Sequence, residues 1–215
     1  MIRIALAQQD FLVGDVPGNL RKALESIEQA RAEQARVILF PELALTGYPP
    51  EDLLLRPGFM RQAHEGLAAL VSAVSGIDVL MGHPWMVGGD RFNAVTWLRE
   101  GEVLGRYYKH LLPNYAVFDE ARYFQPGSDP LVIGVDGCRF GVLICEDAWQ
   151  PGPAAKAKSA GADVLLIPNA SPYRDDKQAD RDAVFARRCE DTHLPMVYCN
   201  LVGGQDELVF DGRSV

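Results

Sequence analysis

Three short apolar segments of this chain each end on a residue that can take part in chemistry. They are residues 37–40 before Glu42, residues 103–108 before Lys109, and residues 138–144 before Cys145. Strand-like segments of this kind alternate with segments of helical periodicity, which indicates an α/β layered domain. In α/β sheets the carboxyl ends of strands meet at one edge, where ligands bind. We therefore expect Glu42, Lys109 and Cys145 to lie at the same edge.

The remaining pattern completes the predicted order of elements. Helical spacing of apolar residues marks segments 19–35, 58–74, 153–160 and 178–192. Further strands are expected at 2–8, 79–84, 164–167 and 196–200. Two hairpins are predicted, 91–99 with 103–108 and 131–135 with 138–145, because short turn signals separate each pair. Inserted hairpins make the expected sheets mixed rather than purely parallel. Residues 1–215 are read as one domain.

Composition limits the classes of function. The net charge is −8, which argues against electrostatic binding to nucleic acid or to an anionic membrane. The first nine residues hold too short an apolar stretch for a signal peptide, and no run reaches the length of a membrane helix. The four cysteines form no CxxC pair and no metal-type spacing. We expect a cytoplasmic protein with free thiols and no metal site.

The three strand-end residues suit nucleophilic catalysis. A cysteine thiol needs a base or a positive neighbour to become a nucleophile. Glu42 can take its proton, Lys109 can stabilise the thiolate and then an oxyanion, and the backbone N–H of Glu146 is a second oxyanion donor. The four histidines are scattered, so a Cys–His pair is less supported. Taken one at a time, the three residues also have ordinary structural interpretations. Glu42 can be a loop carboxylate, Lys109 a surface lysine and Cys145 a core residue.

Three ordered blocks give these residues a family context. The blocks are Phe-Pro-Glu-Leu at 40–43, Tyr-Lys-His-Leu-Leu-Pro at 108–113 and Leu-Ile-Cys-Glu-Asp at 143–147. Together they resemble the signature blocks of the nitrilase, or carbon–nitrogen hydrolase, superfamily. The resemblance implies a four-layer α-β-β-α sandwich. It also implies that Glu42 is the general base, Lys109 the oxyanion stabiliser and Cys145 the nucleophile, with Glu120 supporting the lysine.

Finer blocks resemble one branch, the glutaminase domains of glutamine-dependent NAD synthetases. They include Thr-Gly-Tyr-Pro-Pro at 46–50, Phe-Asp-Glu at 118–120 and Asn-Ala-Ser-Pro-Tyr at 169–173. The resemblance implies L-glutamine as substrate, bound by Tyr115, Ser171 and Lys177, and no cofactor for its hydrolysis. It further implies a homo-oligomer and a synthetase domain, outside this chain, that uses ATP and the ammonia to amidate deamido-NAD. Without the resemblance, Ser171 reads as a turn former and Lys177 as a solvated residue.

Two departures from the family pattern leave alternatives open. Gly-Gly-Gln-Asp at 203–206 superficially resembles a pyrophosphate loop, but it lacks the serines, and we interpret it as a turn. The nitrilase fold normally continues past position 215, so we expect a domain that is incomplete at its C-terminus. One alternative is a stand-alone aliphatic amidase or N-carbamoyl amide hydrolase. Another is a catalytically inert fragment that acts as an assembly scaffold.

Overall fold

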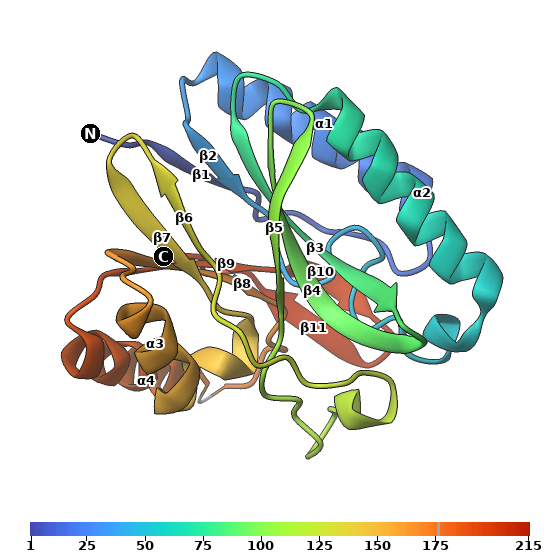
Figure 1. Ribbon diagram of the computed structural model, residues 1–215. Coiled ribbons are helices and arrows are strands. Elements are labelled where there is room, and N and C mark those ends of the chain that lie inside the picture. The colour runs from blue at the N-terminus through green and yellow to red at the C-terminus, as the bar shows by residue number, and fades with distance from the viewer. Residues whose placement is uncertain (176) are drawn as a thin grey trace.

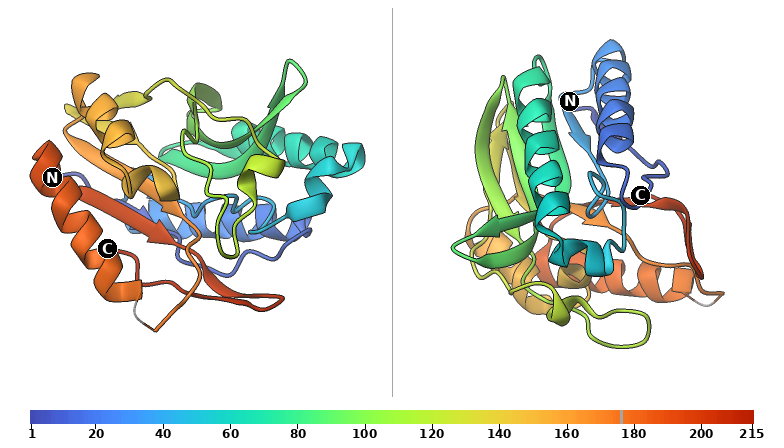
Figure 2. Two further views of the ribbon diagram at one scale, coloured as in Figure 1. Left: turned by 90° about the horizontal axis from the view of Figure 1, so that it is seen from below. Right: turned by 90° about the vertical axis from the view of Figure 1, so that its right-hand side faces the viewer.

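The protein folds into four layers, with two β-sheets face to face and helices on the outside (Figure 1). The computed structural model describes residues 1–175 and 177–215, with only the backbone of Lys177. Two helices cover the first sheet and two cover the second, as the perpendicular views also show (Figure 2). They are α1 (Val16–Ala32) and α2 (Pro57–Ala73), then α3 (Pro151–Ser159) and α4 (Lys177–Thr192). The predicted α-β-β-α sandwich is confirmed.

Both large sheets are mixed. The first has the order β1-β2-β3-β4-β5, and its strands are β1 (Ile4–Leu6), β2 (Val37–Leu39), β3 (Asp78–Val87), β4 (Asp90–Arg99) and β5 (Glu102–Tyr108). Strands β1 to β3 pair in parallel, and β3, β4 and β5 pair antiparallel. The second has the order β6-β7-β8-β9, and its strands are β6 (Val132–Val135), β7 (Cys138–Val142), β8 (Val164–Asn169) and β9 (Met196–Asn200). Only β6 and β7 pair antiparallel within it.

The core follows the two-residue period of the strands. Ile38 on β2 joins the apolar cluster under α1 and α2, whereas its neighbours Val37 and Leu39 join the cluster that fills the space between the sheets. Alternate residues of a strand point to opposite faces, so a strand buried on both sides is apolar throughout. The first sheet is therefore the wall that separates the outer helices from the space between the sheets.

Some predicted boundaries need correction. Strand β7 ends at Val142 rather than at position 145, and Cys145 instead opens a short 3₁₀ turn, η3 (Cys145–Ala148). The Gly-Gly-Gln-Asp segment is not simply a turn. Most of it lies in β10 (Val202–Gln205), which pairs antiparallel with β11 (Leu208–Asp211). The segment after β5, to which the sequence analysis assigned no helix or strand, contains the 3₁₀ turn η2 (Glu120–Arg122).

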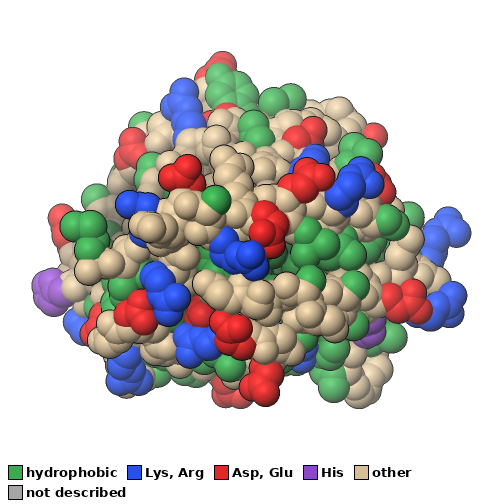
Figure 3. All heavy atoms as spheres, turned by 90° about the horizontal axis from the view of Figure 1, so that it is seen from above, with side chains coloured by type: hydrophobic (Ala, Val, Ile, Leu, Met, Phe, Trp, Pro, Cys, Tyr) green, Lys and Arg blue, Asp and Glu red, His purple; other side chains and the backbone are tan. Residues whose placement is uncertain are grey.

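The surface mixes charges of both signs. On the face shown in Figure 3, Lys and Arg side chains lie next to Asp and Glu side chains. Across the described residues, the helices are too short or too polar to cross a bilayer.

Candidate active site

Glu42, Lys109 and Cys145 follow strands β2, β5 and β7 and meet at one end of the sandwich. The turn that carries Glu42 packs against β3 at Gly82, where an added Cβ would lie 2.3 Å from the carbonyl oxygen of Pro41. Only a residue without a side chain leaves room for this approach of two backbones. Gly82 therefore helps to fix where Glu42 enters the site.

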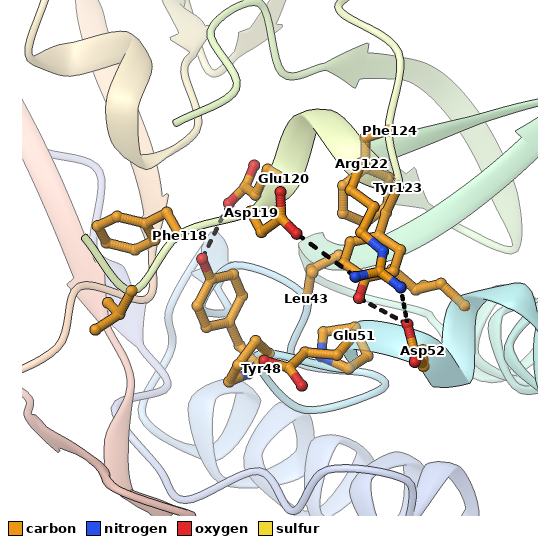
Figure 4. A pocket seen from close by; sticks show the side chains of 14 residues that line it. Leu43, Tyr48, Glu51, Asp52, Phe118, Asp119, Glu120, Arg122, Tyr123 and Phe124 are labelled. Atoms are coloured by element: carbon orange, nitrogen blue, oxygen red, sulfur yellow. Dashed lines mark hydrogen bonds and ion pairs between the residues drawn. The ribbon is translucent and has the colours of Figure 1, made fainter. Parts of the chain in front are cut away.

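Lys109 lies between two carboxylates in the interior. Its Nζ donates to Glu42 Oε1 at 2.7 Å and to both oxygens of Glu120 at 2.8 Å. The side chains of Lys109 and Glu42 are 0% exposed. Tyr48 adds a further donor, since its hydroxyl lies 3.0 Å from Glu120 Oε1, the contact drawn in Figure 4. Glu120 thus contacts the lysine that it is predicted to support, and the role itself stays a prediction.

Two further donors orient the Glu42 carboxylate. Asn93 Nδ2 donates to Oε1 at 2.7 Å, and the backbone N–H of Ala170 donates to Oε2 at 3.1 Å. Asn93 also lies 3.5 Å from Glu120 Oε2. Among the described residues, Oε1 is thus shared by Lys109 and Asn93, whereas Oε2 accepts from Ala170 alone. A carboxylate oxygen has two lone pairs, so Oε2 keeps capacity to accept a proton.

Electrostatics keep Lys109 charged. Burial alone would lower its pKa, but the negative charges of Glu120 and Glu42 outweigh burial and hold the pKa well above its usual value. For Glu120, burial raises the pKa most, Lys109 opposes this and Glu42 adds to it, and the net direction is upward. A permanently charged ammonium suits a group that must stabilise negative charge.

Cys145 lies at the start of η3 in a conformation that L residues seldom adopt, with φ at +44°. Such backbone strain persists where the surrounding structure fixes it, and it is concentrated at functional sites. The residue is only 4% exposed. Burial raises the pKa of its thiol well above the usual value, the charge of Glu42 adds to the rise, and Lys109 only partly opposes it. A thiol whose pKa is raised in this way needs a base during the reaction, which is the part that the sequence analysis gave to Glu42.

Of the predicted substrate-binding residues, Tyr115 lines a cavity and Ser171 does not. The Tyr115 hydroxyl donates to Glu146 Oε2 at 2.9 Å, and both residues line an open cavity of about 540 Å³. Ser171 is buried, its N–H donates to Asn200 Oδ1 at 3.0 Å, and it lines neither of the cavities described here. The side chain of Lys177 falls outside the described part of the chain.

A second cavity, of about 230 Å³, lies on the Glu120 side of the cluster. Figure 4 shows Tyr48 pointing toward Glu120, with Asp52 beside Arg122 and Tyr123. Asp52 and Arg122 form an exposed ion pair at 3.3 Å. Of the two cavities, one is lined by Tyr115 and Glu146, and the other is lined by Glu120 of the buried cluster.

The ring nitrogens of His83 and His110 have partners other than Cys145. His83 Nε2 lies 2.6 Å from Thr96 Oγ1, and burial lowers the pKa of His83 to about 3. His110 Nε2 lies 3.2 Å from the carbonyl oxygen of Asp129. Within the described residues, no group of three or more His, Cys, Asp or Glu side chains is arranged to hold a metal ion.

Three residues of the site escaped the sequence argument. Asn93 is a buried polar residue in an apolar strand, which is itself a signal because buried polar groups need partners. Tyr48 and Asp147 lie inside recognised sequence blocks, but nothing local to them predicts their partners. Those partners, Glu120 for Tyr48 and Tyr107 for Asp147, are 72 and 40 positions away.

Fold and site together define a nitrilase-type hydrolase. The sequence matches the carbon-nitrogen hydrolase family over residues 3–215, and the chain belongs to that family.

Relatives of the chain indicate which branch of the family it resembles. The glutamine-dependent NAD(+) synthetase of Xanthomonas campestris pv. campestris (strain 8004) is 51% identical over the whole chain, and that of Aquifex aeolicus (strain VF5) is 45% identical. The chain spans 39% and 38% of these proteins, so it corresponds to their nitrilase-like domain only. The structure of the Acinetobacter baumannii glutamine-dependent NAD+ synthetase superposes with a TM-score of 0.95 at 41% identity, covering 99% of this chain and 40% of that one.

A stand-alone enzyme is also similar. A variant of the amidase from Nesterenkonia sp. AN1 superposes with a TM-score of 0.88 at 27% identity, and the match covers 100% of this chain and 84% of that one. In that structure acrylamide has undergone Michael addition at the active site cysteine.

Proposed function

We propose that residues 1–215 form a glutaminase domain, which hydrolyses L-glutamine to glutamate and ammonia through a thioester on Cys145. The observation that carries the proposal is the buried cluster of Glu42, Lys109 and Glu120 beside a strained cysteine. The choice of glutamine as the substrate rests on the relatives, which are glutamine-dependent synthetases.

The first half-reaction uses Glu42 as the base. Glu42 Oε2 takes the thiol proton of Cys145, whose raised pKa makes such a base necessary. The sulfur attacks the side-chain carboxamide carbon, and the charge that develops on the oxygen is stabilised by Lys109 and by the backbone N–H of Glu146. The carbon–nitrogen bond then breaks, the proton on Glu42 passes to the leaving nitrogen, and ammonia departs from a γ-glutamyl thioester.

The second half-reaction repeats the chemistry with water. Glu42 removes a proton from water, the oxygen attacks the thioester carbon, and the same two donors stabilise the oxyanion. The carbon–sulfur bond breaks, the sulfur regains a proton from Glu42, and glutamate is released. Glu120 acts by keeping Lys109 charged and directed at the site.

Binding of the free amino acid requires partners for its ammonium and its carboxylate. Glu146, held by Tyr115, offers negative charge to the substrate ammonium. Lys177 and the Ser171 hydroxyl suit the substrate carboxylate, by resemblance to the synthetase branch.

The remaining roles concern the whole protein. Ammonia released here supplies a synthetase domain that amidates deamido-NAD with ATP, and the glutaminase reaction itself uses no metal and no cofactor. We further propose a cytoplasmic homo-oligomer, on the resemblance to the synthetase branch.

Thiol labelling tests the proposal directly. Each cysteine is alkylated and its rate followed by mass spectrometry of peptides, with and without millimolar L-glutamine. We expect Cys145 to react faster than Cys138, and glutamine, but not asparagine, to slow it. Cys145→Ala should abolish glutamine hydrolysis and leave the fold intact. Comparable turnover by that variant would show the mechanism to be wrong.

A second candidate is an aliphatic amidase or N-carbamoyl amide hydrolase with the same catalytic residues. The fold supports it, because the Nesterenkonia amidase superposes over the whole chain with a TM-score of 0.88. Turnover of simple amides without glutamine protection of Cys145 would select this candidate.

A further inference from the structure

Asp147 is a fully buried carboxylate that accepts hydrogen bonds from four groups. The donors are the Tyr107 hydroxyl at 2.9 Å, the Ile144 N–H at 3.1 Å, the His110 N–H at 3.1 Å and the Leu111 N–H at 2.9 Å. Tyr107 and Ile144 bind Oδ2, whereas His110 and Leu111 bind Oδ1. Both oxygens are therefore occupied by groups of the protein.

Two of these donors are sequence neighbours of the residues predicted to be catalytic. Ile144 immediately precedes Cys145, and His110 immediately follows Lys109. His110 and Leu111 lie 37 and 36 positions before Asp147 in the chain, and Ile144 lies three positions before it. We propose that Asp147 is a positioning residue that holds the turn bearing Cys145 in register with the strand end bearing Lys109. The inference rests on the proposed function in one respect, namely that these two side chains react.

The strained turn explains why such a group is needed. The backbone of Asp147 donates to the Ile144 carbonyl oxygen at 3.0 Å while its side chain accepts from the Ile144 N–H, so the turn around Cys145 is closed from both directions. A residue held at positive φ relaxes unless its surroundings determine its conformation. Relaxation would move the sulfur relative to Glu42 and the Lys109 ammonium. A displacement of about 1 Å at a reacting centre lowers rates by about 100-fold.

An asparagine at this position tests the idea at nearly constant volume. Its oxygen can still accept, but its NH₂ group would face two of the four donors. Acrylamide is the probe, because its Michael addition forms a sulfur–carbon bond, the thiol hydrogen ends on the adjacent carbon, and glutamine recognition is not involved. We measure the adduct at Cys145 by peptide mass spectrometry as a function of acrylamide concentration, with Cys138 as the internal reference.

We expect Asp147→Asn to lower the maximal labelling rate of Cys145 by about 10- to 100-fold, with a half-saturating concentration changed less than about threefold. Labelling of Cys138 should not change. Asp163→Asn is the matched control, since Asp163 also accepts a backbone N–H, from Arg139 at 2.8 Å, but lies exposed and outside the site. This control should label Cys145 at the wild-type rate.

Labelling of Cys145 within about threefold of wild type in folded Asp147→Asn would overturn the inference. If that variant does not fold, Tyr107→Phe decides, because it removes one donor without adding another. A smaller slowing is expected, and a wild-type rate would overturn the inference. Wild-type protein that labels fast but does not hydrolyse glutamine would refute the proposed substrate and leave Asp147 testable. Wild-type Cys145 no faster than Cys138 would refute both.

Discussion

Replacing Lys109 with methionine should strongly destabilise the protein. The lysine is 0% exposed and lies within 2.8 Å of two buried carboxylates. Removal of one partner from a buried ion pair costs about 3–5 kcal/mol of unfolding free energy. Here two carboxylates are left facing each other, so we expect about 5 kcal/mol. For a domain of this size, that corresponds to a fall in Tm of about 10–20 °C.

The deficit should depend on pH. Burial already raises the folded-state pKa of Glu120, and Lys109 is the group that opposes the rise. Without the lysine this pKa rises further above the unfolded value. A carboxyl group of that kind contributes stability below its unfolded pKa, and the contribution is lost as pH rises through the folded pKa. The free energy lost by Lys109→Met should therefore be larger at about pH 8 than at about pH 5.

Urea unfolding at about pH 5 and about pH 8 measures the unfolding free energy that Lys109→Met loses at each pH. Lys158→Met is the matched control, because Lys158 is exposed on α3 and its loss should change stability by less than about 0.5 kcal/mol. Adding Glu120→Gln to Lys109→Met should recover part of the deficit, since it removes one of the two opposed carboxyl groups. If Lys109→Met stays within about 1 kcal/mol of wild type at both pH values, the buried-charge argument is wrong.

Two further substitutions test how Glu42 is held. Gly82→Ala places a Cβ 2.3 Å from the Pro41 carbonyl oxygen, so we expect urea unfolding to show a loss of about 1–3 kcal/mol in unfolding free energy, with a clear fall in kcat. The control Gly134→Ala places its Cβ in open space and should change neither quantity. Asn93→Ala removes a donor to Glu42, and steady-state kinetics should show kcat lowered by about 10- to 100-fold with KM nearly unchanged. Unaltered kcat in both site variants would mean that Glu42 is placed by other contacts.

The order of elements was predictable because it depends on local pattern. The helices over 57–73 and 177–192 and strand β9 lie within one or two residues of their predicted ranges. Boundaries failed where tertiary contacts decide them. Residues 143–145 look like a continued strand, yet the hydrogen bonds of Asp147 turn the chain there.

The supporting residues of the site were not predictable in the same way. Asn93 reaches Glu42 across 51 positions, and Tyr48 reaches Glu120 across 72. Such pairs arise only when the strands have paired and the turns have packed. A local pattern records that a residue is polar and buried, but not which group satisfies it.

The sequence by itself determined the family, the α/β layers and the identity of Glu42, Lys109 and Cys145 as candidates, because strand ends and ordered blocks are properties of short segments. The tertiary structure alone decided that Lys109 lies between two carboxylates, that burial raises the pKa of Cys145, and that Asn93 contacts Glu42 and Asp147 contacts Ile144. These features depend on burial and on distances between segments that are far apart in the chain. Burial sets the energy of a charge, and only the folded arrangement sets burial.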